Sequence, residues 1–83
     1  MLRERLQHLL RQRPFRPFRI ELNDGRVFEI HFPEINLLGQ SYIDIGIPEP
    51  DNPDPYYDHL VFVPLSLIRH VELLPEAAVP ETR

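Results

Sequence analysis

The chain has 83 residues, a length that suits one domain with a small core, because so short a chain buries only about 60% of its unfolded surface. It contains no cysteine, which excludes disulfides and thiolate metal sites, and no apolar run approaches the roughly 20 residues of a membrane span. No charged start followed by an apolar run indicates a signal peptide, so we expect a cytoplasmic protein without membrane contacts.

The formal net charge is −4, but it is spread unevenly along the chain. Residues 1–32 hold seven arginines and four acidic residues, whereas residues 33–83 hold two arginines and nine acidic residues. All nine basic residues are arginine, whose guanidinium suits carboxylates and phosphates. The uneven charge favours head-to-tail self-association or pairing within the chain, and it disfavours a protein that binds polyanions over its whole surface.

Residues 2–12 are predicted to form a helix. Four leucines recur with the period of 3.6 residues and form one apolar stripe: Leu2, Leu6, Leu9 and Leu10. Pro14 disfavours helix at the residue before it, so the helix should stop near Arg13. Because three turns are marginal alone in water, the stripe must dock on the rest of the domain or on a partner.

Residues 13–18 form a tandem Arg-Pro-Phe triplet. Prolines at this spacing favour polyproline II, which has three residues per turn. Three arginines would then share one ridge: Arg13, Arg16 and Arg19. Phe15 and Phe18 would share another, and we favour their pinning the helix to the sheet over their forming a binding ridge.

A β-hairpin is predicted around Asn23-Asp24-Gly25, because residues 18–22 and 26–32 alternate with period two. A two-residue loop would place Ile20 opposite Glu29 and mix the two faces of the sheet. A three-residue loop with Gly25 in a left-handed bulge pairs like with like: Phe18 with Ile30, Arg19 with Glu29, and Ile20 with Phe28. We therefore predict the bulged turn.

Three further strands are predicted, at residues 41–47, 59–63 and 69–74. Gly46, on the outer face of the first of them, indicates a bend or a close backbone approach. Connections and a tail complete the chain: a turn or single helical turn at 33–39, a loop rich in proline and acid at 48–58, a 3₁₀ turn at 64–68 and a mobile tail at 75–83.

These elements predict a mainly β domain over residues 1–74, in which the N-terminal helix caps a partly closed, five-stranded barrel. The predicted core takes the inward positions of the helix and strands: Leu6, Leu9, Leu10, Phe18, Ile20, Leu22, Phe28, Ile30, Phe32, Ile43, Ile45, Ile47, Leu60, Phe62, Ile68, Val71 and Leu73.

The order of a helix, a hairpin, a third strand and two strands joined by a 3₁₀ turn resembles the layout of SH3-like and Sm-like barrels. Leu22–Arg26 (LNDGR) stands where Sm-like proteins carry their first hairpin, and Glu34-Ile35-Asn36-Leu37 looks like their first motif. That resemblance implies that Asn36 contacts an RNA base. The second motif differs, since Val63-Pro64-Leu65-Ser66 replaces its Arg-Gly or Cys-Gly step, and the glycine usual in the second strand is missing.

The chain also resembles a group of small bacterial proteins, found in planctomycetes among others. They share an Arg-Pro-Phe-x-Pro-Phe lead, an Asp-Gly-Arg hairpin and a Pro-Glu step, present here at residues 13–18, 24–26 and 33–34. A hydrophobic Val-x-Leu-x-x-Ile end corresponds to residues 62–71. This resemblance implies a shared fold and no particular chemistry.

Catalytic and metal-binding patterns are weak. Five residues suggest a metal site by type, His31, Asp51, Asp54, Asp58 and His59, but their spacing lacks the glycine and terminal glutamate of an EF-hand. Neither Ser41 nor Ser66 stands in Gly-x-Ser-x-Gly, and so small a domain has little room for a shielded pocket. We expect a solvated acidic loop, no metal, no cofactor, no small-molecule substrate and no enzymatic activity.

The sequence therefore favours a non-catalytic interaction module that self-associates or belongs to a larger assembly. The residues expected to bind a protein partner are the apolar and aromatic ones outside the strands: Leu2, Leu6, Phe15, Tyr56 and Tyr57. The alternative is an Sm-like RNA-binding protein, in which Arg13, Arg16 and Arg19 face phosphates and Asn36 faces a base.

Overall fold

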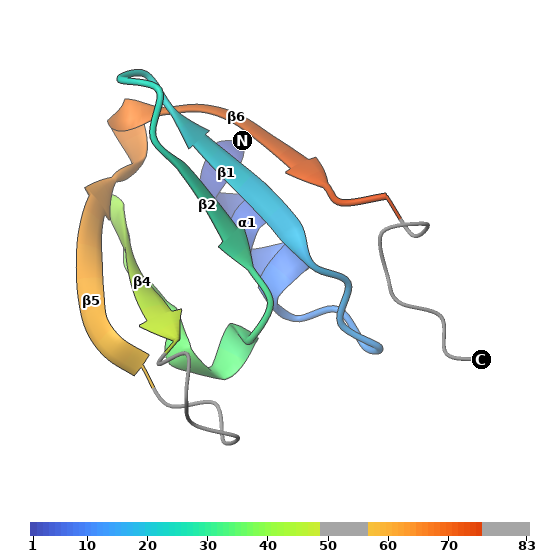
Figure 1. Ribbon diagram of the computed structural model, residues 1–83. Coiled ribbons are helices and arrows are strands. Elements are labelled where there is room, and N and C mark those ends of the chain that lie inside the picture. The colour runs from blue at the N-terminus through green and yellow to red at the C-terminus, as the bar shows by residue number, and fades with distance from the viewer. Residues whose placement is uncertain (49–56, 76–83) are drawn as a thin grey trace.

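A computed structural model describes residues 1–48 and 57–75, with the backbone alone at 57 and 58. The chain forms one α-helix, six strands and two 3₁₀ turns in these residues (Figure 1). In chain order they are α1 (Leu2–Leu10), β1 (Phe18–Leu22), β2 (Val27–Ile30), η1 (Pro33–Ile35), β3 (Leu37–Leu38), β4 (Tyr42–Pro48), β5 (Tyr57–Pro64), η2 (Leu65–Leu67) and β6 (Ile68–Leu73).

The strands form two antiparallel sheets of three strands each, in the orders β2-β1-β6 and β3-β4-β5. The prediction of a mainly β domain with an N-terminal helix is confirmed. The prediction of five strands is wrong, because η1 separates β2 from the short additional strand β3. Pro33 opens η1 and has no N–H to donate to a ladder, which explains the break. No ladder joins the two sheets within residues 1–48 and 57–75, so these residues form no closed barrel.

The predicted hairpin is confirmed in its register. Gly25 has a φ of 93°, in the left-handed region, and the pairs are those of the three-residue loop: Phe18 with Ile30, Arg19 with Glu29, and Ile20 with Phe28. The Asp24 side chain accepts a hydrogen bond from the Arg26 backbone N–H at 3.0 Å. That bond lowers the pKa of the Asp24 carboxyl below its usual value.

Helix α1 is tied to both sheets. The Arg3 Nε donates to the Gly39 carbonyl next to β3 at 2.9 Å, and the Arg5 guanidinium donates to the Val71 carbonyl of β6 at 3.2 Å. Leu6 and Leu9 are buried in the shared core. The helix ends at Leu10, two residues before the predicted end, and the Gln12 side chain bonds to the Leu9 carbonyl at 3.0 Å. The leucine stripe therefore docks on its own domain.

The core combines the helix with the inner faces of both sheets. Its buried members come from six elements: Leu6, Leu9, Phe18, Ile20, Leu22, Ile30, Ile43, Ile45, Val63 and Val71. Other predicted core residues are half-buried against them: Leu10, Phe28, Ile47, Ile68 and Leu73. One buried hydrophobic residue, Val63, is absent from the predicted core.

The predicted facing of β5 is wrong. Val63 lies opposite Ile43 and points inward, whereas Phe62 lies opposite Asp44 and is 63% exposed. Since neighbours across a ladder share a face, the inward isoleucines of β4 bring the valines of β5 inward and turn Leu60 outward. Phe32 is also exposed, because it lies beyond the end of β2 and precedes η1.

Candidate interaction surface

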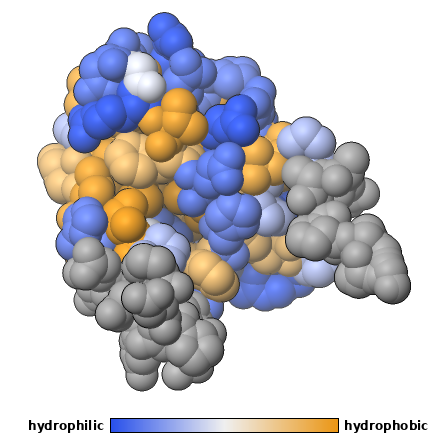
Figure 2. Space-filling view, viewed as in Figure 1, coloured by the Kyte–Doolittle hydropathy of each residue, from blue (hydrophilic) through white to orange (hydrophobic). Residues whose placement is uncertain are grey.

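The outer face of the sheet β3-β4-β5 carries large apolar side chains in solvent, and we call it the outer β4–β5 face. Leu37 is 59% exposed and Leu60 is 47% exposed, and both flank β4 as Phe62 does. Figure 2 shows apolar residues gathered on the left of the molecule, where β4 and β5 lie in Figure 1. Exposed apolar patches on small proteins often mark binding sites.

Two aromatic rings lie together on this face. The centroids of Tyr42 and Phe62 are 5.2 Å apart, with an angle of 31° between the ring planes. The Tyr42 ring also covers Gly39, where an added Cβ would stand 2.3 Å from ring carbons. Gly39 thus leaves space for the Tyr42 ring. The rings of Tyr42 and Phe62 together form an aromatic surface beside Asp44.

Asp44 stands at the centre of a cross-strand row. Its backbone partner in β3 is Leu37 and its partner in β5 is Phe62, so an acidic side chain lies between two exposed apolar ones. Asp44 is half-buried, and its carboxylate makes no hydrogen bond or ion pair with any described residue. Among its described side chains, the outer β4–β5 face therefore presents one unpaired negative group, surrounded by apolar ones.

Asn36 holds the edge of this sheet. Its Oδ1 accepts the Gly46 backbone N–H at 3.1 Å, and its Nδ2 donates to the Phe32 carbonyl at 2.8 Å. The chain passes so close that a Cβ on Gly46 would stand 2.2 Å from the Ile35 carbonyl oxygen, which confirms the close approach predicted at Gly46. Each end of the Asn36 amide thus makes one hydrogen bond to the backbone of its own chain.

The outer face of the other sheet is charged. Arg19 on β1 lies 3.3 Å from the carboxylates of both Glu29 on β2 and Glu72 on β6. The ring nitrogens of His31 and His70 extend this row at 3.2 and 3.0 Å from Glu29 and Glu72. The contact with His31, then that with Arg19, lowers the pKa of Glu29 below its usual value. The two sheets therefore show solvent faces of opposite character.

The three arginines of the predicted ridge have different partners in the structure. The chain bends at Arg13, whose guanidinium donates to the Gln12 carbonyl at 2.7 Å. Arg16 donates to the Leu74 carbonyl at 3.3 Å, and Arg19 lies between its two glutamates. Of the three, Arg19 is the one whose printed partners are carboxylates.

The predicted partner-binding residues are mostly engaged inside the domain. Leu6 is fully buried and has no surface for a partner, which corrects its assignment. Phe15 is half-buried with its ring centroid 6.0 Å from that of Phe18, which supports its role in pinning the helix. Leu2 is also half-buried against the core. Tyr56 and the Tyr57 side chain lie outside the described part of the chain.

Sequence reasoning missed three exposed apolar residues: Leu37, Leu60 and Phe62. The sequence places Leu60 and Phe62 in the predicted core. Because β5 is apolar on both faces, its own pattern does not indicate which side chains point inward. The signal available was the neighbouring strand, since the alternation of β4 sets which residues of β5 point inward once the ladder is known.

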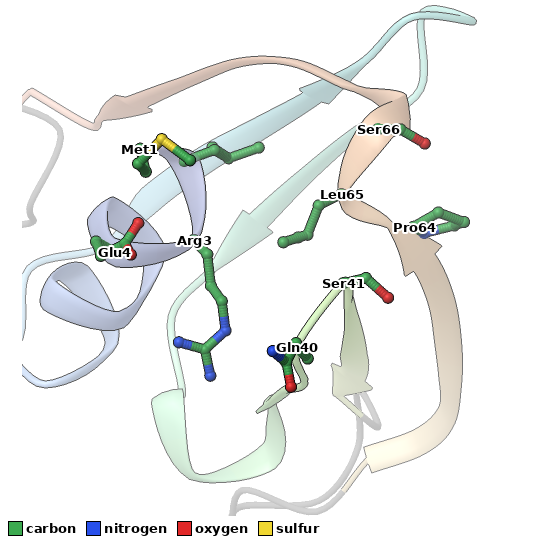
Figure 3. Close-up of a pocket in the computed structure, with 9 residues that line it drawn as sticks. Met1, Arg3, Glu4, Gln40, Ser41, Pro64, Leu65 and Ser66 are labelled. Carbon is green, nitrogen blue, oxygen red and sulfur yellow. The ribbon is translucent and has the colours of Figure 1, made fainter.

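A cleft of about 550 Å³ opens between the first turn of α1, the two residues before β4, and the junction of β5 with η2 (Figure 3). The Leu65 side chain points into it and that of Glu4 points away. Ser41 and Ser66 line it, but the described lining residues include no histidine that would activate a serine hydroxyl. The described residues likewise contain no cluster of three or more histidine and acidic side chains suited to a metal ion.

Comparison of the chain with protein-family models, with characterised proteins and with solved structures finds no match. None of the helices in the described ranges is both long and apolar enough to traverse a lipid bilayer. The surfaces of the chain itself are therefore the basis for a functional proposal.

Proposed function

We propose that this protein is a small, non-catalytic interaction module whose outer β4–β5 face binds another protein chain. The observation that carries the proposal is the exposure of Phe62, 63%, beside Leu37 and Leu60 on one sheet face. Covering a phenylalanine side chain is worth about 1.5–3 kcal/mol. A partner that covers this face therefore gains binding free energy from burying Leu37, Leu60 and Phe62.

We also propose that the two sheets are the halves of one bent SH3-like or Sm-like sheet. In support, β2 and β3 follow one another with η1 between them, as parts of one interrupted strand. The short turn η2 leads from β5 directly into β6, which returns to pair with β1.

Protein binding is favoured over the Sm-like RNA alternative by the engagement of the residues that RNA would need. Asn36 bonds to two backbone groups, and Arg19 is flanked by two glutamates. Asp44 at the centre of the apolar face would also repel phosphates. A cysteine-free chain fits a reducing compartment, so we place the partner in the cytoplasm, as a second copy or a different protein.

The test is site-specific photo-crosslinking in the cells that produce the protein. A photoreactive phenylalanine analogue at position 62 should form adducts with a partner chain. The matched control is position 27, because Val27 is 49% exposed on the face of the other sheet and should form none. Equal labelling from both positions, or none from position 62, would contradict the proposal.

A further inference from the structure

We infer that the outer β4–β5 face binds one amphipathic helix of a partner protein, and that this helix places an arginine on Asp44 within its apolar stripe. The inference rests on the proposed function and adds the chemistry of the partner. Its basis is the position of an unpaired carboxylate inside an apolar surface, together with the size of that surface.

The carboxylate determines what a partner must bring. Any chain that covers Leu37 and Phe62 also covers Asp44, which lies directly between them in the ladder. A buried carboxylate without a partner is strongly unfavourable, so a wholly apolar segment would be rejected. A cation in the stripe removes that penalty and gives the face its selectivity.

The aromatic neighbour favours arginine over lysine. Side chains directly opposite one another in an antiparallel ladder have Cβ atoms about 5 Å apart, so a cation on Asp44 is within reach of the Phe62 ring. A guanidinium is planar and forks onto a carboxylate while its face stacks on an aromatic ring. A lysine ammonium can make the ion pair without the same stacking.

The dimensions of the face suit one helix. From Leu60 to Pro64 strand β5 rises by about 13 Å, and the three strands span about 10 Å between the outer two. That is the length of about nine helical residues and the width of one helix.

A second copy of the chain is a poor occupant. A two-fold dimer that packs the outer β4–β5 face on itself buries both Asp44 carboxylates against a face whose described residues offer no arginine. The only α-helix among the described residues, α1, buries Leu6 and Leu9 in its own core and exposes Glu4, Arg5 and His8. It therefore has no free apolar stripe to offer another copy.

The experiment uses the full chain and two helical peptides of about 14 residues with a leucine stripe, identical except for arginine or glutamine at the central stripe position. Binding is followed by NMR titration of backbone amides. The arginine peptide should shift the amides of Leu60 and Phe62 and bind about tenfold more tightly than the glutamine peptide. Asp44→Asn should remove that preference, while leaving the far-ultraviolet circular dichroism spectrum unchanged.

The matched control is Glu21→Gln, which removes an acid from the outer face of the other sheet and should keep the preference. A charge swap adds a positive test, because Asp44→Arg should prefer a glutamate peptide. Equal binding of the arginine and glutamine peptides would overturn the cation requirement but leave the interaction module intact.

Three further results would overturn the inference. They are shifts at Phe62 on simple concentration of the protein, which would identify a second copy, shifts at Phe62 with an oligouridine RNA, and no response to either peptide. In each case the crosslinking result from position 62 tells the two proposals apart. Adducts from position 62 would mean that the surface is right and the occupant wrong, and their absence would mean that the surface is wrong.

Discussion

Gly39 and Gly46 both lack room for a side chain, but different atoms take up the space. At Gly46 the obstacle is the backbone carbonyl of Ile35, whereas at Gly39 it is the outer part of the Tyr42 ring. The backbone at Ile35 is held by the hydrogen bond from the Gly46 N–H to the next residue, Asn36, so it moves less easily than the half-buried ring of Tyr42. These contacts set the shape of the outer β4–β5 face.

We predict that Gly46→Ala lowers the free energy of unfolding by about 1–3 kcal/mol, because the Ile35 backbone must move. Gly39→Ala should cost less, because the Tyr42 ring can swing away at the loss of about 0.5–1.5 kcal/mol of contact with Phe62. Urea denaturation measures both costs, and near-ultraviolet circular dichroism should change chiefly in Gly39→Ala. The reverse order of stability would show that Ile35 does not lie over β4.

Strand β5 shows how one element can serve both the core and a surface. Val63 packs inside against Ile43 and Val61 is half-buried beside it, while Phe62 between them meets solvent. The same strand therefore contributes to stability with one face and to the proposed binding with the other.

We predict that Val63→Ala lowers the free energy of unfolding by about 1–3 kcal/mol, since it leaves a cavity in the core. Phe62→Ala should cost less than about 1 kcal/mol, chiefly through the lost contact with Tyr42. Chemical denaturation of the two variants is the measurement. A larger loss of stability in Phe62→Ala than in Val63→Ala would show that Phe62, rather than Val63, points into the core.

The sheet β2-β1-β6 carries a pH-sensitive row of charges. Because the pKa of Glu29 is lower in the folded chain, its charged form stabilises the fold above the unfolded pKa, and this contribution is lost as pH falls through the folded pKa. The same sign holds for Asp24, whose pKa is also lowered.

We predict that the melting temperature falls more between pH 5 and pH 3 in the wild type than in Glu29→Gln, because glutamine cannot lose a charge. Thermal unfolding followed by circular dichroism at a series of pH values measures this. Glu34→Gln, at an exposed acid on η1, is the control and should keep the wild-type slope. Parallel curves for Glu29→Gln and the wild type would show that Glu29 gains nothing from His31 and Arg19.

At the scale of the whole molecule, the helix makes one core out of two separate sheets. Leu6 is fully buried among residues of both sheets, and Arg3 and Arg5 bond to backbone on either side. We predict that Leu6→Ala costs about 2–5 kcal/mol, and that hydrogen exchange quickens in β1 and β4 alike. Leu2→Ala, at a half-buried position of the same stripe, should cost less, and faster exchange in one sheet only would show two independent units.

The sequence alone specified the local structure of this protein, namely the hairpin register and the inward face of the helix. The hairpin register follows from Gly25 and the period-two alternation around it, and the helix and its inward leucines follow from the 3.6-residue period. Both signals lie within a few residues of chain, where backbone sterics and side-chain direction act directly.

Only the tertiary structure decided the faces of β5, the engagement of Asn36 and the isolation of the arginines. β5 is apolar at both alternate sets of positions, so its facing depends on the ladder with β4, which the sequence of β5 does not encode. Asn36 and Arg19 take partners from other elements, among them Gly46 and Glu72. Pairing between strands far apart in the sequence decides whether such a side chain is buried or exposed. It places Phe62 and Asp44 on the outer β4–β5 face.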